Sequence, residues 1–201
     1  RMTAAMGRGG RIEGLAVRIA VPATARQQWR RLQGDSAVDA IANTSDAHDP
    51  LAIDGAMPPY VIPNLTVDHF PVDLPLPTGL WRGNAHSYTA FFVESFINEL
   101  AAKAGVEPLS YRMQMLVGQT RLARCLTTVA TMSGWDGGAG ASGKGLACHS
   151  MYGSHIAVIV TARTGDQGVR VDRISAAVDC GRLINPEIAR QQIEGGIIFG
   201  L

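Results

Sequence analysis

Six prolines fall between residues 58 and 79, and this run constrains the fold more than any other feature of the chain. A proline fixes φ and lacks an N–H group, so it excludes a helix and, within a sheet, fits only an edge strand. Apolar residues alternate between the prolines, and residues 67–72 can form a short extended piece. We therefore predict an ordered, extended connector here rather than a flexible linker. The prolines are Pro58, Pro59, Pro63, Pro71, Pro75 and Pro77.

The chain before this connector has the pattern of a β-hairpin. Residues 11–21 alternate between apolar and polar side chains, which predicts a strand. Residues 2–6 are its candidate partner, with a turn at residues 7–10. Residues 22–58 are polar and have little periodicity, so we predict a loop with one or two short helical turns.

After the connector the apolar spacing becomes helical. Residues 90–104 carry Phe92, Phe96 and Leu100 on one stripe and are followed by Gly105. Further helices are expected at residues 108–117, which open on a proline, and at residues 120–133.

The last part of the chain returns to strands and then ends in a helix. Residues 137–145 are rich in glycine and predict a loop. Residues 155–163 and 169–178 predict an antiparallel pair of strands, joined by a turn at residues 164–168. Asn185, followed by a proline and a glutamate, is a helix start.

The whole pattern predicts an α+β fold, with a mixed or antiparallel sheet and packed helices. We expect a β-rich segment with an irregular loop and the proline-rich connector at residues 1–79, and an α+β segment at residues 80–201.

Composition narrows the classes of function. The formal net charge is +1, so no global charge favours a nucleic-acid partner, and we read the early arginines as a solvated face. The three cysteines, Cys125, Cys148 and Cys180, form no C-x-x-C pair and are expected to be buried and inert. No apolar run is long enough to span a membrane. The sequence opens and stops within structured patterns, so we expect it to be a portion of a longer protein.

Two constellations can carry chemistry. In the first, a glycine-bearing loop at residues 79–87 places Arg82 before a helix, an arrangement that suits an anion. The alternative is that Arg82 is a surface ion-pair partner. In the second, a strand ends at Asp179, Gly181 turns the chain and Asn185 caps a helix. Glycines are costly inside a helix, so Gly195-Gly196 indicates close approach by a ligand or by another backbone.

Other readings of the polar residues are weaker. His149 and His155 flank Tyr152-Gly153, but no third metal ligand is evident beside them, so we predict no metal site. A nucleophile elbow, a P-loop and a dinucleotide fingerprint are all missing.

Together these segments resemble the molybdopterin-binding large subunit of the xanthine oxidase and aldehyde oxidoreductase family. Residues 179–186, with Gln192-Ile193-Glu194-Gly195-Gly196 and Phe199-Gly200-Leu201, are similar to its D-x-G-x-x-x-N-P…Q-x-E-G…G-L signature. Leu80-Trp81-Arg82 and residues 90–101 resemble the branch that contains the isoquinoline 1-oxidoreductase large chain. The similarity covers most of the chain outside residues 22–58.

The resemblance implies an activity, cofactors and partners. Such enzymes oxidise aldehydes or hydroxylate N-heteroaromatic compounds with oxygen from water, using molybdenum on a molybdopterin, in bacteria usually its cytosine dinucleotide. Electrons pass to [2Fe–2S] clusters on a small partner subunit, and a cytochrome c subunit is a further candidate partner. Among the compartments, the resemblance favours a periplasmic, membrane-associated location over the cytoplasm.

The resemblance also assigns roles to residues. It gives Arg82 a place near the substrate, where it would stabilise negative charge, and it places Gln192, Gly181 and Asn185 on the pterin wall. We expect the loop at Arg82 and the turn after Asp179 to line one cleft that other polypeptide completes.

Two departures from the family pattern limit these roles. Gly83-Asn84-Ala85-His86-Ser87 replaces the family's Phe-Gly-x-Pro-Gln run after the arginine. The M-G-Q-G pterin motif and the segment with the glutamate base are absent from this chain, and neither Glu94 nor Glu194 is a substitute for that base. We therefore expect this portion alone to hold no cofactor and to be inactive. The competing hypotheses are a non-catalytic α+β interaction domain and, with less support, a hydrolase that uses His149 or His155 with Asp179.

Overall fold

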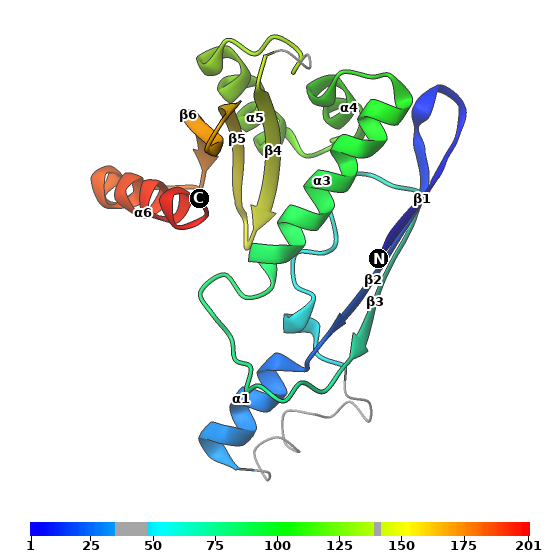
Figure 1. Cartoon of the computed structure of the whole chain (residues 1–201), viewed down its shortest axis with the longest axis vertical. Helices are drawn as coiled ribbons and strands as arrows, with labels where there is room; N and C mark the ends of the chain where they lie inside the picture. The colour runs from blue at the N-terminus through cyan, green and yellow to red at the C-terminus, as the bar shows by residue number, and fades with distance from the viewer. Residues whose placement is uncertain (35–47, 139–141) are drawn as a thin grey trace.

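The computed structural model describes residues 1–34, 48–138 and 142–201 of the chain. These residues form two three-stranded sheets and five α-helices, so the predicted α+β class is confirmed. In Figure 1 helix α3 (His86–Ala104) runs between the two sheets, and the long first sheet extends down one side of the molecule.

The first sheet has the order β1-β2-β3. Strands β1 (Met2–Met6) and β2 (Ile12–Val21) form the expected antiparallel hairpin around a 3₁₀ turn at Arg8–Gly10. Strand β3 (Asn64–Pro71) lies parallel to β2 at the edge of the sheet. The proline-rich connector therefore supplies an edge strand, as its missing N–H groups require.

Helix α1 (Thr24–Gln33) corrects the expectation of a loop with short helical turns after β2. The helix buries no residue, although Ala25, Trp29 and Leu32 have the spacing of one helix face, a signal that the sequence prediction did not use. Its alanine, arginine, glutamine and leucine residues are strong helix formers, and they favour the helix without a core-facing side. A short 3₁₀ turn follows at Pro50–Ala52, and the rest of the predicted loop, residues 35–47, lies outside the described residues.

Three consecutive helices follow the connector, as predicted. Helix α3 begins four residues earlier than the apolar pattern indicated, at His86, and ends at Gly105 in a left-handed conformation. Helices α4 (Pro108–Met115) and α5 (Thr120–Ser133) lie close to their predicted ranges.

The second sheet has the order β4-β5-β6 and is antiparallel throughout. Strands β5 (Ser154–Gly165) and β6 (Gly168–Asp179) form the predicted pair. Strand β4 (Lys144–Met151) was not predicted, and it replaces the end of the expected loop at residues 137–145, of which residues 139–141 are outside the described part. Its glycine, alanine and serine residues have weak strand propensity, so the strand depends on pairing with β5.

The core lies where α3 and α5 meet the sheets. Leu122, Leu126 and Val129 of α5 are fully buried, and Ile97 of α3 is fully buried with them. Helix α6 (Pro186–Phe199) is different, because it buries no residue of its own. No helix among the described residues is long and apolar enough to cross a membrane.

Candidate functional site

The segment that leaves β6 has the geometry that its sequence predicted. Asp179 ends the strand, and its Oδ1 accepts a hydrogen bond from the Gly181 N–H at 3.2 Å. Gly181 has φ +78°, a left-handed conformation that favours glycine. Asn185 then caps α6, since its Oδ1 accepts a hydrogen bond from the Ile188 N–H at 3.1 Å.

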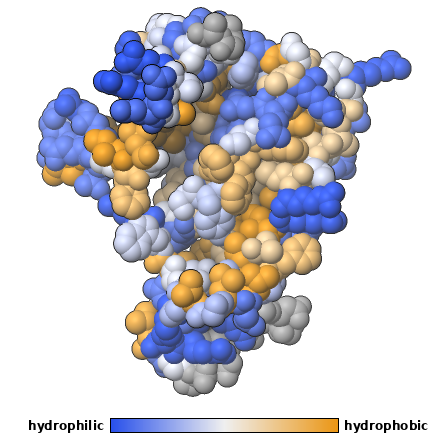
Figure 2. Space-filling view, in the orientation of Figure 1, coloured by the Kyte–Doolittle hydropathy of each residue, from blue (hydrophilic) through white to orange (hydrophobic). Residues whose placement is uncertain are grey.

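Helix α6 encloses an open groove against β6. The groove has a volume of about 560 Å³ and is lined mainly by apolar side chains. Gln192 lies on α6 and is exposed, and a Cβ added to Gly195 or Gly196 would meet nothing within 4 Å. No neighbouring helix therefore accounts for this glycine pair among the described residues. Apolar side chains remain exposed along α6, and hydrophobic surface is visible there in Figure 2. Those exposed are Ile184, Ile188, Ile198, Phe199 and Leu201.

Arg121 of α5 fixes the end of β6 with a network that sequence reasoning did not find. Its Nε and Nη2 donate to the two carboxylate oxygens of Asp179 at 3.0 and 2.6 Å. Nη2 also reaches the Asp179 carbonyl, and Nη1 donates to the Gly153 carbonyl at 2.9 Å. The hydrogen bonds from Arg121 hold the pKa of the Asp179 carboxyl well below its usual range. The carboxylate is thus an anchor for the turn rather than a free base.

The Arg82 loop is held from both sides. On its N-terminal side, two glutamines of helix α1 bind the connector. Gln27 Oε1 accepts a hydrogen bond from the Thr78 hydroxyl at 2.6 Å, and Gln28 accepts one from the Leu80 N–H. The Asn84 N–H bonds the Trp81 carbonyl at 2.9 Å and so closes a turn around Arg82. Arg82 itself is exposed and forms no hydrogen bond or ion pair with the described residues. The alternative of a surface ion pair is therefore not seen in the described part.

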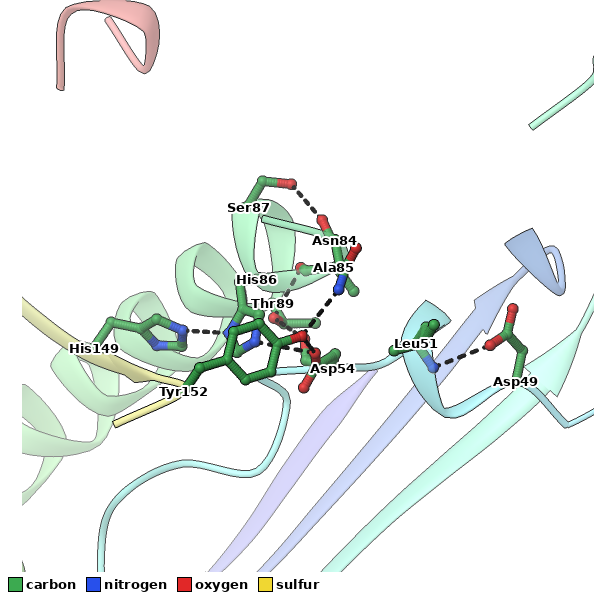
Figure 3. Close-up of polar contacts among 10 residues, drawn as sticks. All are labelled: Asp49, Leu51, Asp54, Asn84, Ala85, His86, Ser87, Thr89, His149 and Tyr152. Carbon is green, nitrogen blue, oxygen red and sulfur yellow. Dashed lines mark hydrogen bonds and ion pairs between the residues drawn. The ribbon is translucent and has the colours of Figure 1, made fainter. Parts of the chain in front are cut away.

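A polar cluster of Asp54, Asn84, His86, His149 and Tyr152 follows this loop (Figure 3). The Tyr152 hydroxyl donates to Asp54 Oδ2 and accepts a hydrogen bond from Asn84 Nδ2 at 2.9 Å. His86 Nδ1 and His149 Nε2 are 2.7 Å apart and share a hydrogen bond. His86 Nε2 lies 3.2 Å from Asp54 Oδ2, but the alignment is too poor for a hydrogen bond, so this is an electrostatic contact.

Burial sets the protonation state of His149 in this cluster. Loss of solvent, together with the nearby His86 ring, lowers the pKa of His149 to about 4, against the opposing effect of Asp54. His149 is therefore neutral at physiological pH. His155 lies elsewhere, with its Nδ1 2.8 Å from the Ser150 hydroxyl. In residues 1–34, 48–138 and 142–201, no group of three or more His, Cys, Asp or Glu side chains is arranged to hold a metal ion.

The turn between β4 and β5, Tyr152-Gly153, lies between the two predicted site segments. Tyr152 contacts Asn84 of the Arg82 loop, and the Gly153 carbonyl contacts Arg121, which holds Asp179. The two segments therefore lie at the same end of the β4-β5-β6 sheet, and they are linked through this turn and not by direct contact. That they line one cleft stays a prediction. Figure 1 shows that end of β4 and β5 beside the start of α3.

Glu94 and Glu194 are explained without a role as base. Glu94 is buried, accepts hydrogen bonds from Arg112 Nε at 3.0 Å and from the Tyr60 hydroxyl at 2.6 Å, and accepts the Cys148 N–H at 2.7 Å. Glu194 pairs with Arg190 on the exposed side of α6.

The cysteines follow the prediction at two positions. Cys125 and Cys148 are buried, and burial raises the pKa of the Cys148 thiol to about 12, so this thiol is inert. Cys180 corrects the expectation of buried thiols, because it is exposed in the turn after β6, which protrudes from the sheet.

Comparison with known proteins identifies the same segment. The family model of the molybdopterin cofactor-binding domain matches residues 98–201, which contain α5, the second sheet and α6. The chain is 29% identical to the beta chain of the isoquinoline 1-oxidoreductase of Brevundimonas diminuta over 165 residues, which is 79% of this chain and 21% of that protein. It is 31% identical to a nicotinate dehydrogenase subunit of Pseudomonas putida over 164 residues, which is 68% of this chain and 14% of that protein.

The chain thus spans about a fifth of the first relative and about a seventh of the second. The predicted strand end, glycine turn and capped helix all lie within the matched residues. The chain belongs to the molybdopterin cofactor-binding family, which contains the large subunits of xanthine oxidase-type molybdenum hydroxylases.

Proposed function

We propose that this chain forms part of the large subunit of a molybdenum hydroxylase that oxidises aldehydes or hydroxylates N-heteroaromatic compounds with oxygen derived from water. One observation carries the proposal: the turn and capped helix after β6, within the matched residues, leave Gly181, Gln192 and the Gly195-Gly196 pair open. The names of the two relatives, which refer to isoquinoline and nicotinate, support an N-heteroaromatic substrate.

The residues that are present fit one wall of a pterin site. The exposed Gln192 amide can both donate and accept hydrogen bonds, as the amide-like edge of a pterin requires. Gly181 and the Gly195-Gly196 pair offer backbone without a covering side chain, so a flat ring system can approach closely. Asn185 would keep the start of α6 in place beside that ring system.

Arg82 would act at the substrate end of the cleft. Its guanidinium is exposed and forms no hydrogen bond or ion pair with the described residues, so it is available to stabilise negative charge that develops on a substrate. When bound, molybdenum on the pterin, which we expect to be the cytosine dinucleotide form, supplies the two-electron oxidation. The residues described here include no glutamate that we assign as the base, so we expect this chain by itself to be inactive.

The complete enzyme would require other polypeptides. We expect a small subunit with [2Fe–2S] clusters to accept the electrons, with a cytochrome c subunit as a further candidate, in a periplasmic, membrane-associated setting.

Expression of the full-length gene together with its small partner subunit tests the proposal. The purified complex should contain molybdenum, release a cytosine nucleotide on acid treatment and reduce a dye in the presence of isoquinoline, nicotinate or benzaldehyde. Colourless protein without metal or nucleotide, from a preparation that is folded, would favour the non-catalytic interaction domain instead.

A further inference from the structure

Tyr152 occupies a backbone conformation that tyrosine rarely adopts. It has φ +48°, and Gly153 has φ +79°, so the two residues between the paired Met151 and Ser154 form a tight turn with two left-handed positions. Turns of this kind favour Asn-Gly, because a bulky side chain is strained at a positive φ. Tyrosine at this position therefore destabilises the turn locally, and an interaction elsewhere in the molecule must compensate for that strain.

Burial of the ring does not supply that reason. The side chain of Tyr152 is 68% exposed, and its contact with the His86 ring is a single edge-on approach with centroids 5.4 Å apart. The distinctive feature is the phenol hydroxyl, which donates to Asp54 and accepts from Asn84. The hydrogen bond to Asp54 raises the pKa of Tyr152, so the hydroxyl keeps its proton and can serve both partners.

The partner on the other side also has a left-handed backbone, which asparagine adopts more readily than tyrosine. Asn84 has φ +47°, and Asn84 and Tyr152 are the two non-glycine residues with a positive φ among those described. Asn84 also closes the turn that presents Arg82, through its N–H bond to Trp81. A single side-chain hydrogen bond of 2.9 Å thus joins two left-handed backbone positions, one of them in the loop that carries Arg82.

The same two-residue turn holds the other site segment. The Gly153 carbonyl accepts a hydrogen bond from Arg121, and Arg121 also donates to the Asp179 carboxylate at the end of β6. The position of the turn therefore fixes the Arg82 loop relative to the glycine turn and capped helix that follow Asp179.

We infer that Tyr152 is a positioning residue that sets the spacing between Arg82 and the β6–α6 segment through its hydroxyl. This inference rests on the proposed function, because it gives that spacing a role in holding substrate and pterin in one cleft. A displacement of about 1 Å in such a site can reduce a rate by roughly a hundredfold, so a hydroxyl at the edge of the molecule can matter for catalysis.

Two substitutions in the full-length enzyme, with its small subunit, separate positioning from stability. Tyr152→Phe removes only the hydroxyl, and Tyr152→Asn removes it while placing a residue that this turn favours. Tyr111→Phe is the control for loss of a hydrogen-bonded hydroxyl at a buried position, because the Tyr111 hydroxyl donates to the Gly10 carbonyl away from both segments. We expect Tyr152→Asn to melt at or above the wild-type temperature.

Both Tyr152 variants should lose at least about tenfold in kcat/KM with the best of isoquinoline, nicotinate and benzaldehyde, or retain less molybdenum at an unchanged melting temperature. Hydrogen exchange in the same protein gives a readout that does not depend on activity, and the amides of Gly83–Ala85 should exchange faster in Tyr152→Phe. Tyr111→Phe should change neither property.

The outcomes distinguish this inference from the proposed function. Wild-type enzyme without molybdenum or nucleotide contradicts the proposed function and the inference with it. A loaded, active wild type accompanied by Tyr152 variants with unchanged kcat/KM, metal content and exchange overturns the inference alone. Losses that follow a lowered melting temperature and are shared by Tyr111→Phe also overturn it, because they assign Tyr152 a purely structural role.

Discussion

Arg121 and Asp179 are 58 residues apart in sequence, yet both carboxylate oxygens of Asp179 accept hydrogen bonds from the Arg121 guanidinium. The same guanidinium also reaches the Gly153 carbonyl. The pair joins helix α5 to the point where β6 ends and the turn toward α6 begins. It therefore controls the position of a segment that buries little of its own surface.

The first prediction concerns this pair. Arg121→Ala should leave the melting temperature nearly unchanged, since both side chains are partly exposed and such pairs contribute little to global stability. Local order should fall, so the amides of residues 179–183 should exchange faster in hydrogen-exchange experiments. Arg121→Lys should rescue only part of the protection, because an ammonium cannot form the bidentate fork.

The control for this experiment is Arg124→Ala at an exposed position of the same helix, because no hydrogen bond or ion pair of this side chain with the described residues is lost. The pH dependence gives a second check. Because the pKa of Asp179 is lowered in the folded chain, the protection should be complete above the ordinary pKa of an aspartate and should fade as the pH falls below it. Equal exchange in the wild type and Arg121→Ala at neutral pH would show that the pair does not order the turn.

A second prediction concerns the buried pair of Glu94 and Arg112. Arg112 is fully buried, and its Nε and Nη2 both lie 3.0 Å from Glu94 Oε2. Arg112→Met should destabilise the chain by about 3–5 kcal/mol, because it leaves a buried carboxylate without its cation. Urea unfolding of the 201-residue chain measures this loss.

The double variant Glu94→Gln/Arg112→Met is the decisive comparison. It removes both charges and keeps an acceptor for the Tyr60 hydroxyl and the Cys148 N–H, so it should recover a large part of the stability lost in Arg112→Met. Arg124→Met, at an exposed arginine, should stay within about 0.5 kcal/mol of the wild type. A double variant less stable than Arg112→Met would contradict the electrostatic explanation, because the buried carboxylate charge is then no longer present.

Sequence patterns that span only a few residues, such as helix caps and glycine stops, were enough to predict part of the fold. The cap at Asn185, the stop at Gly105 and the range of α5 all follow from such signals, and the structure confirms each of them. Helix α1 was missed because its few apolar residues lie among arginines and glutamines in a polar segment, and strand β4 was missed because it becomes a strand through its pairing with β5.

The site was harder to predict, because its contacts join distant parts of the chain. Asp54 and Tyr152 are 98 residues apart, and no spacing in the sequence indicates that they meet. The Tyr-Gly pair stands out in the sequence only as a neighbour of two histidines. Its positive φ values follow from the hairpin, and the hairpin was invisible without β4. The functional roles of Arg82, Gln192, Gly181 and Asn185 and the division of the chain at residue 79 stay predictions.

A third prediction follows from the neutral state of His149. Its pKa is about 4 in the folded chain and 6.5 for a free histidine, so the unfolded chain takes up the proton first. The free energy of unfolding should therefore fall as the pH is lowered from about 6.5 to about 4, by an amount on the order of 2–3 kcal/mol, and this contribution should not change further below pH 4.

Acidic groups begin to titrate in the lower part of this range, so the measured quantity is the difference between the wild type and His149→Gln. The variant cannot take up the proton, and its unfolding free energy should have the shallower slope between these pH values. Parallel curves for the two proteins would exclude His149 as the source of the slope.

The last prediction separates two roles of Asn185. As a cap, its Oδ1 accepts the Ile188 N–H, and Asn185→Ala should weaken α6 by about 1 kcal/mol, seen as faster exchange of the amides in its first turn. Asn185→Asp keeps the acceptor and adds a negative charge that the helix N-terminus favours, so α6 should be as well ordered as in the wild type. A pterin contact through the side-chain amide, in contrast, needs the N–H donors that Asp lacks.

In the full-length enzyme, an Asn185→Asp variant with an ordered α6 and normal molybdenum content would assign Asn185 to capping alone. Loss of molybdenum with an ordered α6 would place its amide at the cofactor.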